Sequence, residues 1–409
     1  MQIGEYIDSY SPVIDGVVTC VKNYAYWLNQ KHGNCYVAAP RCPGYEDTDP
    51  FSVYRFTSVP VPKKPPYRFG VSALDYRYHK AMAVQYPQLV HAHSPFTAGW
   101  DALRFAKRRD IPIVATFHSK FYDDFLEAVG SPFLARQALK PIVRFFTLAD
   151  HVWSVNEATA ETLRSYGYKG EIEVMPNGVD MATSAPEPEL QARVRAQLQL
   201  SPDKPLLLFV GQQVNQKNIP MLLEALAIIK RKGVDFQMLS VGEGKDRVHY
   251  RELIQKLGLT DSVRLPGPIR DRDMLKGLYQ CADLLTFPSL YDNAPLVVKE
   301  AAAMACPALL VKGSNAAAEA SMDNVNSFLC DEATPESIAQ RIVEALSDRE
   351  KLLEVGQTAQ KTLVQPWEKI VDRVAARYRQ IIIEHQPRHR RPQKIKLRVK
   401  FNIRAKTRG

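Results

Sequence analysis

Two loops in the C-terminal half of the chain carry side chains suited to an anionic ligand. The first loop is the segment VGQQVNQK (210–217), which follows an apolar run and precedes a helical pattern with Asn218 as a candidate cap. Its Gly211 lets a ligand approach the backbone closely, and Lys217 can meet a phosphate group as a point charge. A lysine in such a loop is also often a solvated side chain, so spacing alone leaves both interpretations open.

The second loop, PSLYDNAPLVVKE (288–300), also joins an apolar run to a helical pattern. Asn293 is a candidate helix cap and Pro295 suits the first helical turn, beyond which free N–H groups can bind a diphosphate. Asp292 and Glu300 can both accept hydrogen bonds from the hydroxyls of one bound sugar. The alternative is an ordinary helix start whose acidic residues only complement the helix dipole.

Polar residues also follow two apolar runs in the N-terminal half. His93 lies in AHSP (92–95) and His118 lies in TFHS (116–119). If the runs are parallel strands, both histidines lie at the carboxyl edge of the sheet, where ligand groups belong. A histidine in such a place is also often a structural residue. Gly16, which closes the first strand-to-helix loop, allows the same two interpretations, because tight turns need glycine in any case.

Apolar runs and helical patterns alternate along both halves of the chain, as expected for parallel sheets. In the N-terminal half we expect strands at 3–7, 35–39, 89–92, 113–116 and 151–155, and helices at 17–30, 100–109 and 134–148. In the C-terminal half we expect strands at 206–210, 236–241, 263–265, 284–287 and 308–311, separated by helices. Ligands of such sheets bind at the carboxyl ends of the strands, so the default site is the cleft between two domains.

The alternation breaks between 177 and 204, and we place the domain boundary there. The expected organisation is an N-terminal domain at 1–178, a linker at 179–204, a C-terminal domain at 205–365, a helix at 366–385 that packs back on the N-terminal domain, and a basic tail at 386–409. The tail has ten positive charges and no acid, which equals the net charge of +10 for the whole chain. It predicts an anionic membrane surface as partner, or a solvated tail without a specific partner.

Composition limits the class of protein. With 409 residues, of which 45% are hydrophobic and 24% charged, the chain suffices for two or three domains, and disordered, collagen-like and disulfide-stapled classes are excluded. The six cysteines form no C-x-x-C pair, and no apolar run approaches the roughly 18 residues of a membrane span. We therefore expect a cytoplasmic protein that is soluble or peripheral to the membrane.

Taken together, these segments resemble the retaining glycosyltransferases of family 4, whose GT-B fold is an α/β fold of two Rossmann-like domains with parallel sheets facing a central cleft. The further segments that carry the resemblance are SPVIDGVVT (11–19), HAHSPF (91–96), ATFH (115–118), VNEAT (155–159) and MPNGVD (175–180). The segment FHSKFYDDF (117–125) resembles family members that glucosylate diacylglycerol at a membrane surface.

The resemblance implies a hexosyltransferase that moves glucose from UDP-glucose to a hydroxyl of a membrane lipid such as diacylglycerol. In the family, the acceptor attacks from the side of the leaving group and the departing phosphate takes the proton, so no cofactor and no catalytic metal are expected. The alternatives are a polysaccharide or another lipid-linked acceptor, and a protein that binds nucleotide sugars without catalysis. Nucleic acid is not the expected partner, although a tail that binds nucleic acid is a third hypothesis.

The same resemblance implies a role for individual residues. Those implied to act in catalysis are His118, Lys217, Asp292 and Glu300. Those implied to bind the donor are Gly16, Val17, Gly211, Gln212, Lys217, Glu243, Asn293, Leu296, Val297 and Glu300. Those implied to bind the acceptor are His93, Phe121 and Tyr122.

Two residues depart from the family pattern. Gln212 stands where the family usually has arginine, which removes one cation from the leaving diphosphate, and Arg270 is a candidate substitute. Asp292 is shorter by one methylene than the usual glutamate. Two D-x-D strings, at 47–49 and 271–273, are interpreted as an acidic turn and a helix start rather than as metal ligands.

Overall fold

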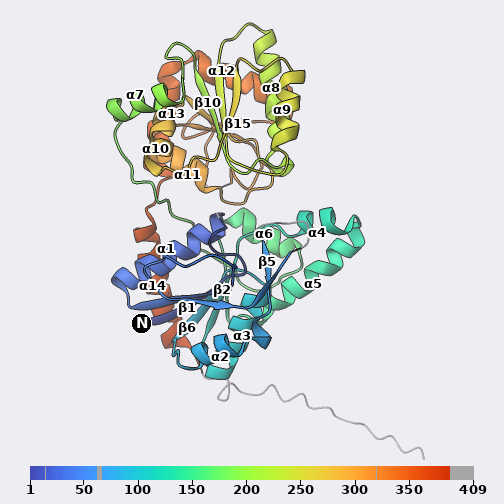
Figure 1. Cartoon of the computed structure of the whole chain (residues 1–409), viewed down its shortest axis with the longest axis vertical. Coiled ribbons are helices and arrows are strands. Elements are labelled where there is room, and N and C mark those ends of the chain that lie inside the picture. The colour runs from blue at the N-terminus through green and yellow to red at the C-terminus, as the bar shows by residue number, and fades with distance from the viewer. Residues whose placement is uncertain (14, 62–66, 319, 387–409) are drawn as a thin grey trace, which may run out of the picture.

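The computed structural model describes residues 1–13, 15–61, 67–318 and 320–386. Two α/β domains lie one above the other along the long axis of the molecule, each with a central sheet and flanking helices (Figure 1). The expected basic tail lies outside the described residues from position 387 onward. No helix in the described part of the chain combines the length and the apolar composition that a bilayer crossing requires.

The N-terminal domain is built on a seven-stranded parallel sheet with the order β3-β2-β1-β6-β7-β8-β9. Its strands are β1 (Gln2–Tyr6), β2 (Asn34–Pro40), β3 (Val53–Phe56), β6 (Leu89–Ala92), β7 (Ile113–Phe117), β8 (His151–Ser154) and β9 (Glu173–Val174). Its helices are α1 (Gly16–Lys31), α2 (Tyr76–Ala83), α3 (Thr97–Arg109), α4 (Tyr122–Val129), α5 (Pro132–Leu148) and α6 (Glu157–Ser165). The domain also contains a short antiparallel pair of strands, β4 (Ser58–Pro60) and β5 (Arg68–Gly70), and the 3₁₀ turn η1 (Ser72–Leu74).

The C-terminal domain is built on a six-stranded parallel sheet with the order β12-β11-β10-β13-β14-β15. Its strands are β10 (Leu206–Val210), β11 (Gln237–Val241), β12 (Val263–Gly267), β13 (Leu284–Thr286), β14 (Ala308–Val311) and β15 (Phe328–Cys330). Its helices are α8 (Ile219–Arg231), α9 (Arg247–Lys256), α10 (Arg272–Cys281), α11 (Leu296–Ala303), α12 (Pro335–Ser347) and α13 (Arg349–Thr362). The 3₁₀ turn η2 (Asn215–Lys217) lies between β10 and α8.

Alternate residues of the N-terminal strands face two separate cores. Ile3 and Val37 belong to the core under α1, whereas Tyr6 and Ala38 belong to the core under α3 and α5. Both faces of the sheet are covered, so the strands are apolar along nearly their whole length, as the apolar runs of the sequence predict. Both sheets therefore present the carboxyl ends of parallel strands, and the loops that follow them, as the places for functional side chains.

The segment 179–204, expected to be a linker, is only partly one. It contains α7 (Pro188–Gln197), which packs on α10, and its Val194 and Leu200 belong to the core of the C-terminal domain. Residues 188–200 are thus part of that domain, because even a weakly amphipathic helix gains free energy by burying its apolar side chains.

The last described helix, α14 (Trp367–Glu384), packs on the N-terminal domain beside α1 (Figure 1). Its Trp367, Val371 and Tyr378 lie in the same core as Ile3. Two segments of the chain pass between the domains side by side, and they are joined by a β-bridge between Val179 and Pro366. Gly178 lies so close to the start of α14 that an added Cβ would be 2.7 Å from the Cα of Trp367. The crossing therefore needs glycine at this position.

Candidate active site

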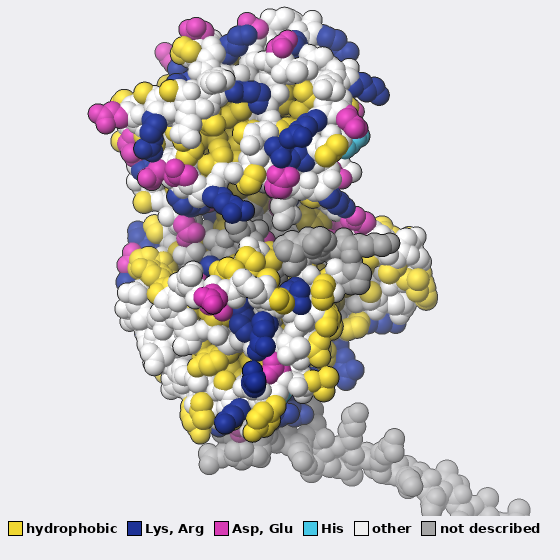
Figure 2. All heavy atoms as spheres, in the orientation of Figure 1, with side chains coloured by type: hydrophobic (Ala, Val, Ile, Leu, Met, Phe, Trp, Pro, Cys, Tyr) yellow, Lys and Arg dark blue, Asp and Glu magenta, His cyan; other side chains and the backbone are white. Residues whose placement is uncertain are grey.

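Loops from the two domains touch at the carboxyl ends of their strands. The Nδ2 of Asn293, after β13, donates a hydrogen bond of 2.7 Å to the backbone carbonyl of His118, after β7. Asn156 donates from Nδ2 to the carbonyl of Asn293 at 2.7 Å, and Lys120 donates from Nζ to the carbonyl of Leu290 at 3.0 Å. Lys and Arg side chains of the C-terminal domain border this junction (Figure 2). The two expected ligand-binding edges are thus held face to face.

Lys217 lies at this junction in an ion pair. Its Nζ is 2.5 Å from Oδ1 of Asp292, and the two side chains are only 13% and 17% exposed. The Nζ also lies 5.8 Å from the centre of the Tyr291 ring. The other carboxylate oxygen of Asp292, Oδ2, is buried and has no hydrogen-bond partner among the described residues. The pair therefore keeps a cation and a spare acceptor beside the loop that touches His118.

Asn218 is the N-cap residue of α8 as predicted, but Asn293 is not that of α11, and both asparagine side chains bind elsewhere. Asn293 is 7% exposed, and besides donating to His118 it accepts a hydrogen bond of 2.9 Å from Asn315. Asn218 donates to the carbonyl of Pro288 at 3.0 Å, which ties the two loops together. Helix α11 begins after Pro295 with no side-chain cap. Its first N–H groups, at Leu296 and Val297, have no partner within the helix and are suited to an anion.

Glu300 lies one turn further along α11 and is paired within its own domain. Its Oε1 is 3.1 Å from a guanidinium nitrogen of Arg272, and its Oε2 accepts a hydrogen bond of 3.1 Å from Tyr279. The Glu300 side chain is 13% exposed. Asp292 and Glu300 thus belong to two different pairs, and Arg272 is a cation that sequence reasoning did not associate with the site.

The first loop is fixed by contacts between two backbones. Gly211 donates to the carbonyl of Val241 at 3.0 Å, and a Cβ added to Gly242 would lie 1.9 Å from the carbonyl oxygen of Gly211. Gly242 has a φ of 143°, so glycine is required there. Gln212 is exposed and lies near Tyr67 of the other domain, whose pKa is raised mainly by burial.

Glu243, implied to bind the donor, is at the surface of the same loop region. Its side chain is 57% exposed and pairs with Arg247 at 3.1 Å.

His118 and His93 form a stacked pair next to a buried carboxyl. Nδ1 of His93 lies 3.0 Å from Nε2 of His118, and Nε2 of His93 lies 2.7 Å from Oε2 of Glu5. Burial lowers the pKa of His93 to about 3, lowers the pKa of His118 well below its ordinary value, and raises the pKa of Glu5. His118 is therefore a neutral hydrogen-bonding group at physiological pH.

His93, implied to bind the acceptor, is 2% exposed and both of its ring nitrogens have partners in this structure. Phe121 is half-buried between the rings of Phe96 and Phe117, and Tyr122 is the half-buried first residue of α4.

The start of α1 also lies on the domain junction. Asp15 caps this helix by accepting from the N–H of Val18 at 2.8 Å. Gly16 is exposed, and an added Cβ would meet nothing within 4 Å, which leaves room for a ligand beside it. Val17 packs against the same core cluster as Leu296 at the start of α11. Two helix starts thus meet one cluster, one from each domain.

Within the described ranges, two groups of side chains have the ligand types of a metal site. Their ligand atoms lie within 4.8 Å of one another, and the groups are Cys20, His93 and His118, and Glu5, His91 and His93. Except for Nδ1 of His118, the histidine nitrogens of both groups already bind one another, Glu5, Tyr378 or Thr116, so we assign them to a hydrogen-bond network.

The two D-x-D strings have structural partners. Asp47 pairs with Arg55 and Asp49 with Lys22, while Asp271 caps α10.

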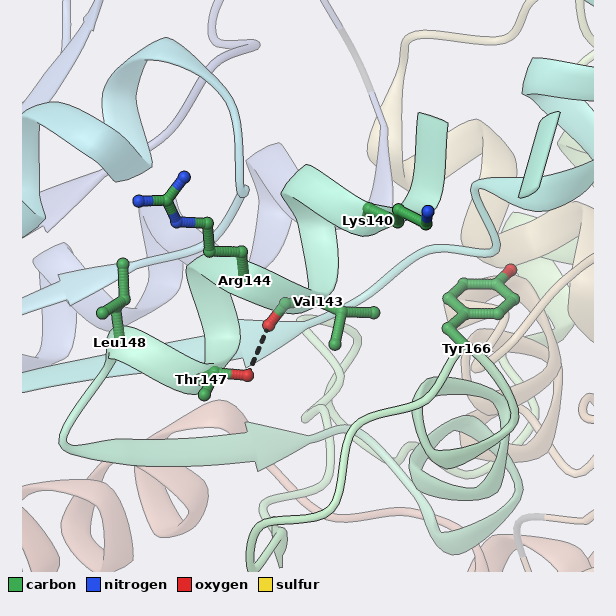
Figure 3. Close-up of a pocket in the computed structure, with 6 residues that line it drawn as sticks. All are labelled: Lys140, Val143, Arg144, Thr147, Leu148 and Tyr166. Carbon is green, nitrogen blue, oxygen red and sulfur yellow. Dashed lines mark hydrogen bonds between the residues drawn. The ribbon is translucent and has the colours of Figure 1, made fainter. Parts of the chain in front are cut away.

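A surface hollow of about 320 Å³ lies along α5, between this helix and Tyr166 (Figure 3). It is lined by Lys140, Val143, Arg144, Thr147, Leu148 and Tyr166. The Thr147 hydroxyl is engaged, because it donates to the Val143 carbonyl at 2.8 Å. None of the residues predicted to bind donor or acceptor lines this hollow.

Two sequence models of protein families match the chain, one per domain. The model described as Glycosyltransferase Family 4 matches residues 14–183, and the model described as Glycosyl transferases group 1 matches residues 191–362.

Two curated relatives illustrate the similarity of the chain to known enzymes. The alpha-monoglucosyldiacylglycerol synthase of Streptococcus pneumoniae is 25% identical over 319 residues, which are 76% of this chain and 70% of that protein. The D-inositol 3-phosphate glycosyltransferase of Segniliparus rotundus is 29% identical over 306 residues, which are 71% of this chain and 66% of that protein.

Among solved structures, Alr3699/HepE from Anabaena in complex with UDP-glucose superposes with a TM-score of 0.74. It is 19% identical, and the match covers 93% of this chain and all of that one, 100%. This likeness confirms the predicted GT-B fold of two α/β domains with parallel sheets.

Proposed function

The chain belongs to the glycosyltransferases of family 4 and group 1, and on this basis we propose that it is a retaining hexosyltransferase. Its proposed donor is UDP-glucose, and its proposed acceptor is a hydroxyl of a membrane lipid such as diacylglycerol. The similarity to the alpha-monoglucosyldiacylglycerol synthase supports this acceptor. The similarity to a D-inositol 3-phosphate glycosyltransferase makes a different, water-soluble acceptor the competing possibility.

The observation that carries the proposal is the position of Lys217 and the uncapped start of α11 at one domain junction. As the bond between sugar and diphosphate breaks, negative charge grows on the diphosphate, and a lysine and free helix N–H groups stabilise that charge. Lys217 exchanges Asp292 for the diphosphate when the donor binds. The released Asp292 carboxylate is then available to accept hydrogen bonds from sugar hydroxyls.

His118 lies across the junction from these groups and is neutral. A neutral imidazole next to the sugar donates or accepts a hydrogen bond without repelling the positive character that develops on the sugar ring. The acceptor hydroxyl attacks from the leaving-group side in the proposed mechanism, and the departing phosphate takes its proton. The protein itself then supplies positioning and electrostatic stabilisation rather than a nucleophile.

Labelled donor tests the reaction. We expect the full chain to transfer label from UDP-glucose to vesicles that contain diacylglycerol, and to use ADP-glucose and GDP-mannose less well. Label in a water-soluble acceptor such as an inositol phosphate would move the proposal to the competing acceptor. No transfer to any hydroxyl acceptor would contradict the proposed enzyme activity.

One observation favours a second candidate, a protein that binds nucleotide sugar without transferring it. Gln212 stands where the family usually has a cation and carries no charge. Lys217 and the start of α11 are therefore the positive groups that we place at the diphosphate. This candidate predicts UDP binding by calorimetry together with no transfer of label from any donor.

The described surface supports a membrane as the site of action. Arg136, Lys140 and Arg144 recur at every fourth position of α5, all three are exposed, and this helix contains no acidic residue. Phe133 and Leu134 at its start are 68% and 51% exposed. Cations next to exposed apolar side chains fit an anionic lipid surface, at about 1 kcal/mol for each cation.

Changing Arg136, Lys140 and Arg144 together to glutamine is therefore expected to weaken binding to anionic vesicles by at least roughly tenfold. Sedimentation with vesicles of mixed phosphatidylglycerol and phosphatidylcholine measures this binding. The matched control changes Arg349, Lys351 and Lys361 of α13 to glutamine, and we expect its binding to be unchanged. Binding that persists in the α5 variant and is lost on removal of 387–409 would place the membrane contact in the tail instead.

A further inference from the structure

A line of buried polar groups leads from the interior of the N-terminal domain to His118. Glu5 on β1 is 0% exposed, and its Oε2 lies 2.7 Å from Nε2 of His93. Nδ1 of His93 lies 3.0 Å from Nε2 of His118. The backbone of His118 is in turn held from the other domain by Asn293. His118 is thus the end of this line that reaches the domain junction.

The single N–H of each neutral imidazole determines which group donates in each of these hydrogen bonds. A neutral imidazole has one N–H and one lone pair, and His93 uses both nitrogens, so all bonds along the line point the same way. If Glu5 keeps its proton, it donates to His93, His93 donates to His118, and the proton of His118 is on Nδ1. If Glu5 is ionised, every bond reverses and Nδ1 of His118 presents a lone pair.

The surroundings of Glu5 favour the protonated carboxyl. Burial raises the pKa of Glu5 well above its ordinary value and lowers the pKa of His91 and His93, so neither neighbouring histidine is a cation. Tyr378 on α14 donates to Oε1 of Glu5 at 3.3 Å, which lowers the pKa of Glu5, but burial has the larger effect. The other titratable groups that face Glu5 are uncharged because burial raises their pKa values, and they are Cys20 and Tyr24 on α1 and Cys35 on β2. An isolated buried carboxylate is unfavourable in such a place.

We propose that Glu5 and His93 are positioning residues which hold His118 in the tautomer with its proton on Nδ1. This N–H then donates a hydrogen bond to an oxygen of the bound sugar. The contact with the sugar rests on the proposed function, whereas the tautomer does not. Among the described residues the hydrogen bond of the His118 ring is made by Nε2, so Nδ1 is the nitrogen left for a ligand.

The tautomer is measured directly by NMR of the full chain labelled with ¹⁵N-histidine at pH 7.5. The two nitrogens of each neutral ring give different shifts according to which one carries the proton, and His118→Asn identifies the signals of His118. We expect His118 to be neutral with its proton on Nδ1 in the wild type. We expect the same in Glu5→Gln, because the amide can still donate to His93. Glu5→Met removes this donor, and we expect the form with the proton on Nε2 to appear.

A His118 signal from the Nε2–H form or from a charged ring in the wild type would overturn the proposal. The exposed His249 provides an internal reference, because its signals should be the same in all variants. UDP-glucose is expected to shift the Nδ1 signal of His118. If the tautomer is as expected and no shift occurs, the sugar contact is wrong. The proposed function fails only if transfer is absent as well.

Kinetics separate positioning from a merely structural role. We expect Glu5→Met to lower kcat by roughly tenfold or more, because the donor that faces the reacting sugar is no longer held in place, with KM for the donor within about twofold. We expect Glu5→Gln to stay within about threefold of the wild type. Equal losses of kcat in both variants would contradict the proposal. That result would mean that the native packing around Glu5 matters, and that the hydrogen-bond donor retained in Glu5→Gln does not.

Discussion

Replacing Lys217 with alanine is expected to lower kcat for sugar transfer by roughly 100- to 1,000-fold, the range for removing one preorganised group that stabilises developing negative charge. The structure adds a second reason for a large effect. Lys217 neutralises Asp292, whose side chain is 17% exposed, so the variant leaves a carboxylate without its cation beside the incoming diphosphate. Steady-state transfer of labelled sugar measures the effect.

Two controls accompany this variant. Lys217→Arg keeps the charge and should recover part of the activity. Lys351→Ala removes a lysine of the same domain that pairs with Glu354 at the surface of α13, and we expect activity within about twofold of the wild type. Unchanged kcat in Lys217→Ala would show that the lysine is only a partner of Asp292.

Glu300→Gln is expected to weaken UDP binding by roughly 10- to 100-fold. Hydrogen bonds to a charged group contribute about 1.5–3 kcal/mol, and we propose that this carboxylate accepts them from hydroxyls of the donor. In the structure, Glu300 is held by Arg272 and Tyr279, and the amide can keep only part of these contacts. Calorimetry with UDP measures the affinity directly, without any need for turnover.

Arg272→Ala distinguishes nucleotide contact from local support. Arg272 is 53% exposed, so its loss should weaken UDP binding less than the loss of the Glu300 charge does. If both variants bind UDP as the wild type does, Glu300 is a structural residue of α11 and α10. The thermal unfolding midpoint of each variant shows whether the fold is intact.

The sheets were largely predictable from the sequence because both their faces are buried. Strands β1, β2, β6, β7 and β10 fall within two residues of the expected apolar runs. Helices α4 and α7 were missed for the opposite reason, because α4 contains no buried residue and α7 buries only Val194. A helix with so little apolar signal is visible only through the neighbour on which it packs.

The site was less predictable than the fold. Motif positions indicated Lys217, Asp292 and Glu300, but not that Lys217 and Asp292 form one pair and that Glu300 pairs with Arg272. The contacts of Asn293 with His118, of Asn156 with Asn293, and of Glu5 with His93 join residues 88 to 175 positions apart. Such pairs follow from strand order and domain placement, which local patterns do not contain.

The most direct test of the account is a crystal structure of the protein with UDP bound. We predict that the diphosphate lies between the two domains, with Nζ of Lys217 and the N–H groups of Leu296 and Val297 within hydrogen-bond distance of its oxygens. In that structure Lys217 will have left Asp292. A diphosphate bound away from the start of α11, with the pair of Lys217 and Asp292 intact, would contradict the account.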